Sequence, residues 1–217
     1  MKLQRTQFTP LGVHVREGLE GEQSRTIAGY AIMFDVPSLP LWEDEYETAR
    51  EVIAPEAVTM ELLNESDIKM TMWHEREILL ARSNRAKEGA SLSYGVDEKG
   101  VWFEFEAPKT SDGDNALELI RRGDIEGCSF AFSTDYTDEA NVSRECVVKD
   151  KRRMVTYTVR NINAIHDFTL ATDPAYVQTE VGLRDAIGLK DIKPEPAKID
   201  NSQAIAALRG EATKSLI

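Results

Sequence analysis

A serine beside a cysteine is the first feature of this sequence that could do nucleophilic chemistry. Cys128 and Ser129 lie in "DIEGCSFAFS", between a helix-like and a strand-like stretch. A serine hydroxyl becomes nucleophilic only beside a base. A thiolate is intrinsically the better nucleophile, but buried free cysteines are usually inert packing residues. On a strand the two side chains leave opposite faces, so only one of them can meet a given base.

The chain has three histidines that could act as that base. His14 has only apolar neighbours in "VHV" and fits an ordinary strand histidine. His74 follows an alternating stretch in "DIKMTMWHERE" and is expected to share a strand face with three apolar residues. Those residues are Ile68, Met70 and Met72. The pattern fits a satisfied core histidine, and equally an imidazole held in a low-water pocket as a general base.

A second histidine and an acid, His166 and Asp167, are adjacent in "NAIHDFTLATDP". Neighbours on a strand point to opposite faces, so the two cannot easily join one cluster. Asp167 is expected to share a face with Ile165 and Thr169. An acid on an inward face needs a partner, and an imidazolium is a good one. The other interpretation, that Asp167 faces solvent, is equally compatible with the pattern.

A metal-dependent hydrolase using His74, His166 and an acid is a further hypothesis. Metal sites generally need three or more ligands in a compact arrangement. The chain has no closely spaced His/Cys pair, and Cys128 and Cys146 are its only cysteines. The sequence therefore predicts no metal and no cofactor, and the two cysteines fit a reducing, intracellular compartment.

Composition narrows the class of protein. The chain has 217 residues, 41% of them hydrophobic, and a formal net charge of −12. A surface this negative repels phosphate backbones and anionic membranes, so we expect neither nucleic acid nor membrane as a partner. No apolar run approaches the roughly 18 to 20 residues of a spanning helix. The first residues lack the apolar segment of a signal peptide, which predicts a protein that is not secreted.

Short strands dominate the pattern that must position these residues. Strand character is found in residues 26–36, 68–74, 90–106 (a hairpin around Asp97 to Gly100), 128–134 and 154–173. Helices are predicted at 54–66 and 111–123, the second with Asp114 as N-cap and Gly123 as its end. The acidic stretch 41–51 is expected to be a solvated loop. Many strands with two or three helices favour a β-barrel or a strongly curved sheet with peripheral helices.

The order of four segments resembles the prohead (head maturation) protease family of tailed bacteriophages. They are "EVIAPEAV", "MWHERE", "ALELIRRGDIEGCSFAF" and "NAIHDFTLATDPAY". The resemblance runs from about residue 26 to residue 181. It implies a serine endopeptidase related in fold to the herpesvirus assemblins. The implied fold is a closed β-barrel of short, mainly antiparallel strands ringed by a few helices.

The resemblance also implies roles for individual residues. Ser129 corresponds to the nucleophile and His74 to the general base and acid. Asp167 stands where the family usually has a glutamate as third member. Because the herpesvirus relatives use a second histidine there, His166 is the alternative. Arg82 is a candidate contributor to the oxyanion or substrate site.

The substrates implied by the resemblance are the scaffolding protein, or the scaffolding segment of the major capsid protein, and the protease itself. The enzyme would act inside the assembling prohead, in the host cytoplasm. Since the herpesvirus relatives need to dimerise, a homo-oligomer is one expectation. A protease domain is expected over residues 1–189. Residues 190–217 would then form a flexible linker with a weak helix, open to self-cleavage.

One alternative function belongs to another class. The same fold could serve as an inactive assembly module that binds capsid or scaffold, and aspartate in place of glutamate at position 167 favours it mildly.

Overall fold

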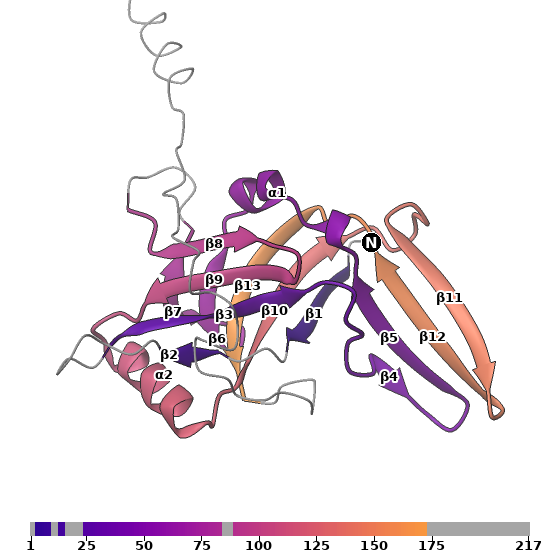
Figure 1. Cartoon of the computed structure of the whole chain (residues 1–217), viewed down its shortest axis with the longest axis horizontal. Coiled ribbons are helices and arrows are strands. Elements are labelled where there is room, and N and C mark those ends of the chain that lie inside the picture. Colours follow the sequence, from indigo (N-terminus) through magenta and orange to yellow (C-terminus); the bar gives the residue numbers. More distant parts are fainter. Residues whose placement is uncertain (1–2, 10–12, 16–23, 84–88, 173–217) are drawn as a thin grey trace, which may run out of the picture. The chain divides into compact units, whose positions relative to one another are not determined.

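Three β-sheets account for most of the described chain. The computed structural model describes residues 3–9, 13–15, 24–83 and 89–172 (Figure 1). The first sheet has five strands. In spatial order they are β1 (Leu3–Thr9), β10 (Gly127–Thr134), β13 (Ala164–Ala171), β6 (Lys69–Met72) and β7 (Glu75–Arg82). β10 and β13 therefore lie side by side at the centre of this sheet, next to β6.

The other two sheets have four strands each. The second sheet has the order β2 (His14–Val15), β3 (Thr26–Met33), β9 (Gly100–Glu106) and β8 (Leu92–Val96). The third has the order β11 (Val142–Lys149), β12 (Arg152–Val159), β5 (Glu47–Ile53) and β4 (Trp42–Glu43). In the described residues β12 pairs with β5, and β13 with β6, in parallel, while the other strand pairs are antiparallel.

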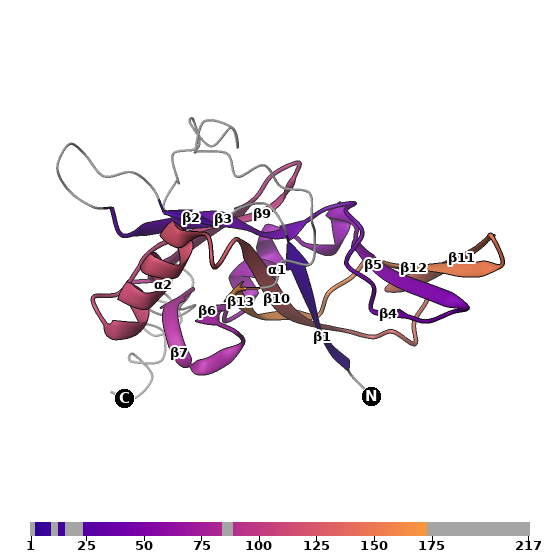
Figure 2. The same cartoon turned by 90° about the horizontal axis from the view of Figure 1, so that it is seen from below.

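The β-rich class with few helices is confirmed, but the closed barrel is not. Closing a sheet into a barrel requires its two edge strands to pair with each other. Within the described ranges the five-stranded sheet ends at β1 on one side and at β7 on the other. Figure 2 shows the labels of β7, β6, β13, β10 and β1 following one another across this open sheet.

The hydrophobic core lies between the first two sheets. β3 contacts both β1 and β10, and the rings of Phe103 on β9 and Phe168 on β13 lie 6.3 Å apart. Every second residue of β10 joins this core: Cys128, Phe130 and Phe132. The alternation that the sequence predicts for this strand is therefore present, with Ser129 on the other face.

The described residues form three helical segments. They are the 3₁₀ helix η1 (Pro55–Ala57), α1 (Met60–Glu65) and α2 (Ser111–Arg122). The N-cap of α2 is Thr110, whose hydroxyl accepts the N–H of Gly113, so the predicted cap at Asp114 is wrong. Gly123 ends the helix in the left-handed conformation, as predicted. α2 contacts β2 and β7 (Figure 2).

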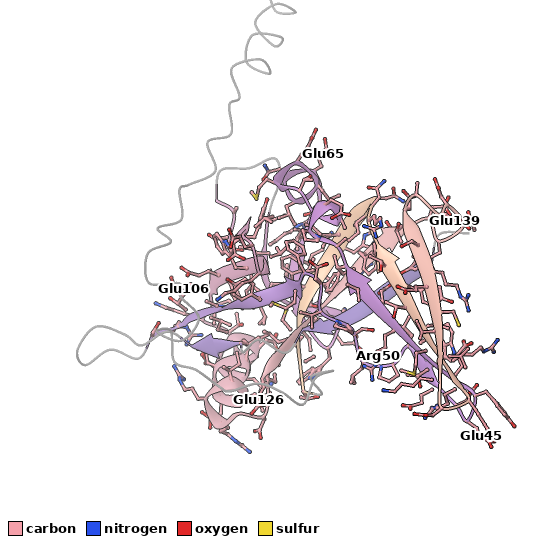
Figure 3. All side chains as sticks on the ribbon, turned by 45° about the vertical axis from the view of Figure 1, so that its right-hand side comes forward. Glu45, Arg50, Glu65, Glu106, Glu126 and Glu139 are labelled. Atoms are coloured by element: carbon pink, nitrogen blue, oxygen red, sulfur yellow. The ribbon has the colours of Figure 1, made fainter. Side chains whose placement is uncertain are left out.

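The acidic stretch is not a solvated loop, because it contains β4 and most of β5. Glu51 on β5 is fully buried and accepts a hydrogen bond of 2.7 Å from the Tyr136 hydroxyl. Glu45 and Glu139 instead project away from the ribbon (Figure 3). No helix in the described part is long and apolar enough to cross a membrane. The predicted tail, residues 190–217, lies outside the described residues.

Candidate active site

A row of three hydroxyl side chains crosses the five-stranded sheet on the face opposite the core. Ser129 on β10 is in register with Thr169 on β13, which is in register with Thr71 on β6. All three are fully buried. We call Ser129, Thr169 and Thr71 the hydroxyl row. Buried hydroxyl groups need hydrogen-bond partners, so a polar environment is required on this face of the sheet.

A β-bulge in β13 leaves Asp167 on the face of the hydroxyl row, two residues from Thr169, and turns Ile165 to the core face. Ala131 pairs with Asp167 and Phe132 pairs with Ile165, so His166 is the extra residue without a partner on β10. Ile165 and Phe168 consequently both join the core although they are three residues apart. The predicted shared face of Ile165 and Asp167 is therefore wrong. Bulges commonly re-aim a side chain beside a functional site.

A two-residue turn brings His74 to this face as well. Met72 pairs with Glu75, and the residues between them, Trp73 and His74, have φ values of 54° and 60°. Two left-handed residues are the requirement of the type I′ hairpin turn. The backbone N–H of Trp73 donates to Leu170 O (3.0 Å), and that of His74 donates to Thr169 Oγ1 (2.9 Å).

This turn corrects the strand predicted for residues 68–74. Ile68, Met70 and Met72 are in the core as predicted. If the strand continued, His74 would point into the core as well, on the wrong face to meet Ser129. The reversal of the chain at residue 73 places the imidazole over the opposite face.

The structure brings Ser129, His74 and Asp167 within hydrogen-bonding distance of one another. His74 Nδ1 lies 2.7 Å from Asp167 Oδ1, and His74 Nε2 lies 3.1 Å from Ser129 Oγ. The Asp167 side chain is 6% exposed, and the His74 side chain is 27% exposed. The imidazole thus connects a buried acid to a buried hydroxyl while one part of its ring stays accessible.

The partners of His74 determine which ring nitrogen carries the proton. An ionised carboxylate can only accept hydrogen bonds, so Asp167 requires the N–H on Nδ1. Nε2 of the neutral ring is then a free acceptor, and the Ser129 hydroxyl is its donor. This arrangement can take the proton from Ser129 Oγ and can hold the resulting imidazolium beside a negative charge.

Cys128 and His166 lie close in sequence to these residues but take no part in the contacts. The Cys128 side chain is buried in the core, and burial raises the pKa of its thiol, which keeps it protonated. His166 is half-buried at the bulge, and burial lowers its pKa. The structure therefore brings Asp167, and not His166, to the imidazole of His74.

Arg82 is not brought to this group of residues. It pairs with Lys69 at the far end of the β6–β7 hairpin, and β7 is separated from β10 by β6 and β13. At the usual spacing of about 4.8 Å per strand, this places Arg82 roughly 14 Å from β10. Its guanidinium binds the carboxylate of Asp67 through both Nε and Nη2, with Nε to Oδ1 at 2.7 Å.

The remaining histidine, His14, belongs to β2, in another sheet. Within the described residues, no three histidine, cysteine, aspartate or glutamate side chains come together as a metal site would need.

Sequence patterns did not point to Thr169 and Thr71. A threonine between apolar residues on a strand is typical of a solvated face, and the alternation placed Thr71 beside Lys69 and Trp73. Only the register of β10, β13 and β6 puts their hydroxyls next to Ser129.

Comparison with known proteins gives a family for the chain. The model of the caudovirus prohead serine proteases matches residues 12–191, which is most of the sequence. Among solved structures, the bacteriophage T4 capsid assembly protease gp21 matches with 12% identity and a TM-score of 0.41. That match covers 80% of this chain and 98% of the other. No curated protein sequence matches. On the extent of the family match, the chain belongs to the caudovirus prohead serine protease family and is a phage prohead serine protease.

Proposed function

We propose that Ser129, His74 and Asp167 are the catalytic triad of this protease. The observation that carries the proposal is the pair of contacts made by one imidazole, 2.7 Å to Asp167 and 3.1 Å to Ser129. Both distances lie within hydrogen-bonding reach, and the base is oriented by the acid, as nucleophilic catalysis requires.

The mechanism follows from the positions of the protons. His74 Nε2 takes the proton of Ser129 Oγ as the oxygen attacks the scissile carbonyl carbon. Asp167 accepts the Nδ1 hydrogen bond throughout and stabilises the imidazolium. Nε2 then protonates the leaving amine, and the acyl group stays on Ser129. Water activated by the same nitrogen hydrolyses the acyl-enzyme and returns the free serine.

The substrates we propose are the scaffolding protein, or the scaffolding segment of the major capsid protein, inside the assembling prohead in the host cytoplasm. Membership of the prohead protease family supports this assignment. Self-cleavage in residues 190–217 is part of the same proposal. Mass spectrometry of wild-type protein after incubation should detect loss of this segment, and a segment that stays intact in active enzyme would rule self-cleavage out.

Substitution of the nucleophile tests the triad against the alternative of an inactive assembly module. Ser129→Ala, co-expressed with capsid and scaffolding protein, should leave both uncleaved, and purified enzyme should no longer react with a fluorophosphonate. Cys128→Ala is the matched control, because its side chain lies on the core face and should not affect cleavage. Equal processing by wild type and Ser129→Ala would refute the proposed nucleophile.

A further inference from the structure

We infer that Thr169 is a positioning residue for catalysis, an inference that rests on the proposed triad. Its hydroxyl oxygen accepts two hydrogen bonds, one from the backbone N–H of His74 and one from the Thr71 hydroxyl, each 2.9 Å long. Thr169 itself is fully buried. In the mechanism above it neither takes nor gives a proton, so we infer that its effect on the chemistry passes through His74.

The location of Thr169 places it at the centre of the site. It is the cross-strand neighbour of Ser129 on one side and of Thr71 on the other. It is also two residues along β13 from Asp167, on the same face of the sheet. One rigid strand therefore carries both the acid that orients the imidazole and the hydroxyl that anchors the backbone of the same histidine.

This anchor is needed because the turn is unfavourable by itself. Residues other than glycine are uncommon at positive φ, and a bulky residue such as Trp73 stays there only when the surrounding structure fixes it. A strained two-residue turn that lost an anchor could relax and displace the imidazole. A displacement of 1 Å at a catalytic group can reduce the rate by about 10²-fold.

The Thr71 hydroxyl fixes the orientation of Thr169, because it donates to the second lone pair of the Thr169 hydroxyl oxygen. A hydroxyl oxygen has two acceptor sites, and in this structure both are occupied by donors from β6 and from the turn that follows it. The Thr169 hydroxyl thus cannot turn away from His74 without leaving a buried donor unpaired. Buried unpaired donors are costly, so the orientation is well defined.

Thr169→Val is the test, because valine keeps the branched shape and removes the oxygen. We expect kcat to decrease by roughly 10- to 100-fold with KM changed by less than about 3-fold. Thr169→Ser restores the acceptor and should recover kcat to within about 3-fold of wild type. Thr134→Val is the matched control, since Thr134 is a buried threonine of β10 whose hydroxyl donates to Asn161 O (2.6 Å), outside the site.

Steady-state cleavage of scaffolding protein gives kcat and KM. The rate constant of fluorophosphonate labelling is followed as a function of pH, with the labelled fraction recorded separately. A merely structural role would reduce the labelled fraction and leave the rate constant and its pH profile unchanged, which would overturn the inference. Ser129→Ala must remain unlabelled. If it is labelled like wild type, the proposed triad fails, whereas wild-type rates in Thr169→Val alone refute only the positioning role.

Thr71→Val provides a second variant in case Thr169→Val does not fold. It leaves the His74 N–H bond in place but frees the Thr169 hydroxyl to rotate, so we expect a smaller decrease in the labelling rate constant, of about 3- to 10-fold. An unchanged rate constant in folded Thr71→Val would show that the hydroxyl row does not control the position of His74, and would also overturn the inference.

Discussion

Two hairpin turns of this protein have similar positive φ values but differ in their contacts with the rest of the fold. The inner turn, Trp73–His74, joins β6 and β7, and the outer turn, Asp150–Lys151, joins β11 and β12. The φ values are 54° and 60° in the inner turn, and 51° and 67° in the outer turn. Both residues of the outer turn are exposed, whereas the inner turn donates both of its N–H groups to β13.

The difference shows what holds each turn. Aspartate tolerates the left-handed conformation comparatively well, so the outer turn is compatible with its local sequence. Tryptophan does not favour that conformation, and the inner turn is held by tertiary hydrogen bonds to β13. A strained conformation stabilised by its surroundings is common at functional sites. Here it carries His74 to the face of Ser129 and Asp167.

The largest difference between the turns should appear when their second residues are replaced by alanine. We expect His74→Ala to lower kcat by about 10³- to 10⁶-fold, because it removes the base that activates Ser129. Lys151→Ala, at the equivalent position of the outer turn, should leave kcat unchanged. Steady-state cleavage of scaffolding protein measures both. A similar loss in the two variants would mean that the turns affect the fold and not the chemistry.

A smaller effect is expected at the acid that orients the inner turn's histidine. Asp167→Asn should lower kcat by about 10³- to 10⁴-fold, since an amide can donate to Nδ1 and so favour the tautomer whose Nε2 cannot accept from Ser129. His166→Ala should change kcat by less than about 3-fold, because burial lowers the pKa of His166 and leaves it a weak partner for an imidazolium. The opposite ranking in cleavage assays would make His166 the third member.

The local patterns were sufficient to predict much of the strand content. The alternation of Cys128, Ser129 and Phe130 is a property of any extended segment with one apolar face, and it correctly separates Ser129 from the core. The left-handed Gly123 that ends α2 was predictable for a similar reason, because only local chemistry decides it.

Two features decisive for the site could not be predicted from alternation. The bulge at His166 changes which residues share a face, and the turn at Trp73 and His74 ends β6 two residues early. Both depend on the register between strands far apart in the sequence, and the turn contradicts the preference of Trp73. Strand periodicity therefore put Asp167 on the face of Thr169 correctly, but it put Ile165 on that face and His74 on the face of Met70 and Met72 wrongly.

The β6–β7 and β11–β12 hairpins also differ at the ends opposite their turns, and Arg82 lies at that end of β6–β7. The open end of the β11–β12 hairpin has a pair of buried valines, Val142 and Val159, whereas Arg82 at the end of β6–β7 binds Asp67. We expect Arg82→Ala to change kcat by less than about 3-fold. Removal of an oxyanion donor would instead lower kcat by about 10²- to 10³-fold. A decrease of that size would show that Arg82 contributes to the oxyanion site.

The ion pair between Arg82 and Asp67 should affect how the free energy of unfolding depends on pH in acid. The hydrogen bond from Arg82 lowers the pKa of Asp67 to about 2. A lowered pKa stabilises the fold above the unfolded-state value near 4, and this contribution is lost as the pH falls from about 4 to about 2. Urea unfolding of Asp67→Asn should therefore lack the part of the acid sensitivity that wild type shows in this window. An unchanged pH profile would show that the ion pair does not form in solution.

The smallest predicted effect tests whether the inner turn is held by tertiary contacts. A glycine has no steric penalty at positive φ, while an alanine is disfavoured by about 1–2 kcal/mol if the turn cannot relax. The His74→Gly variant should then be more stable than His74→Ala by about this amount in urea unfolding. For the exposed outer turn, the stability of Lys151→Gly should exceed that of Lys151→Ala by a smaller amount, because that loop can relax and the unfolded-state entropy of glycine offsets part of the gain. Since both His74 variants lack the base, their difference reports on the backbone: the strain of alanine in the folded turn, less the greater entropy of glycine in the unfolded chain. An equal or smaller difference at His74 would mean that β13 does not constrain the turn, and the strain inferred for the site would be absent.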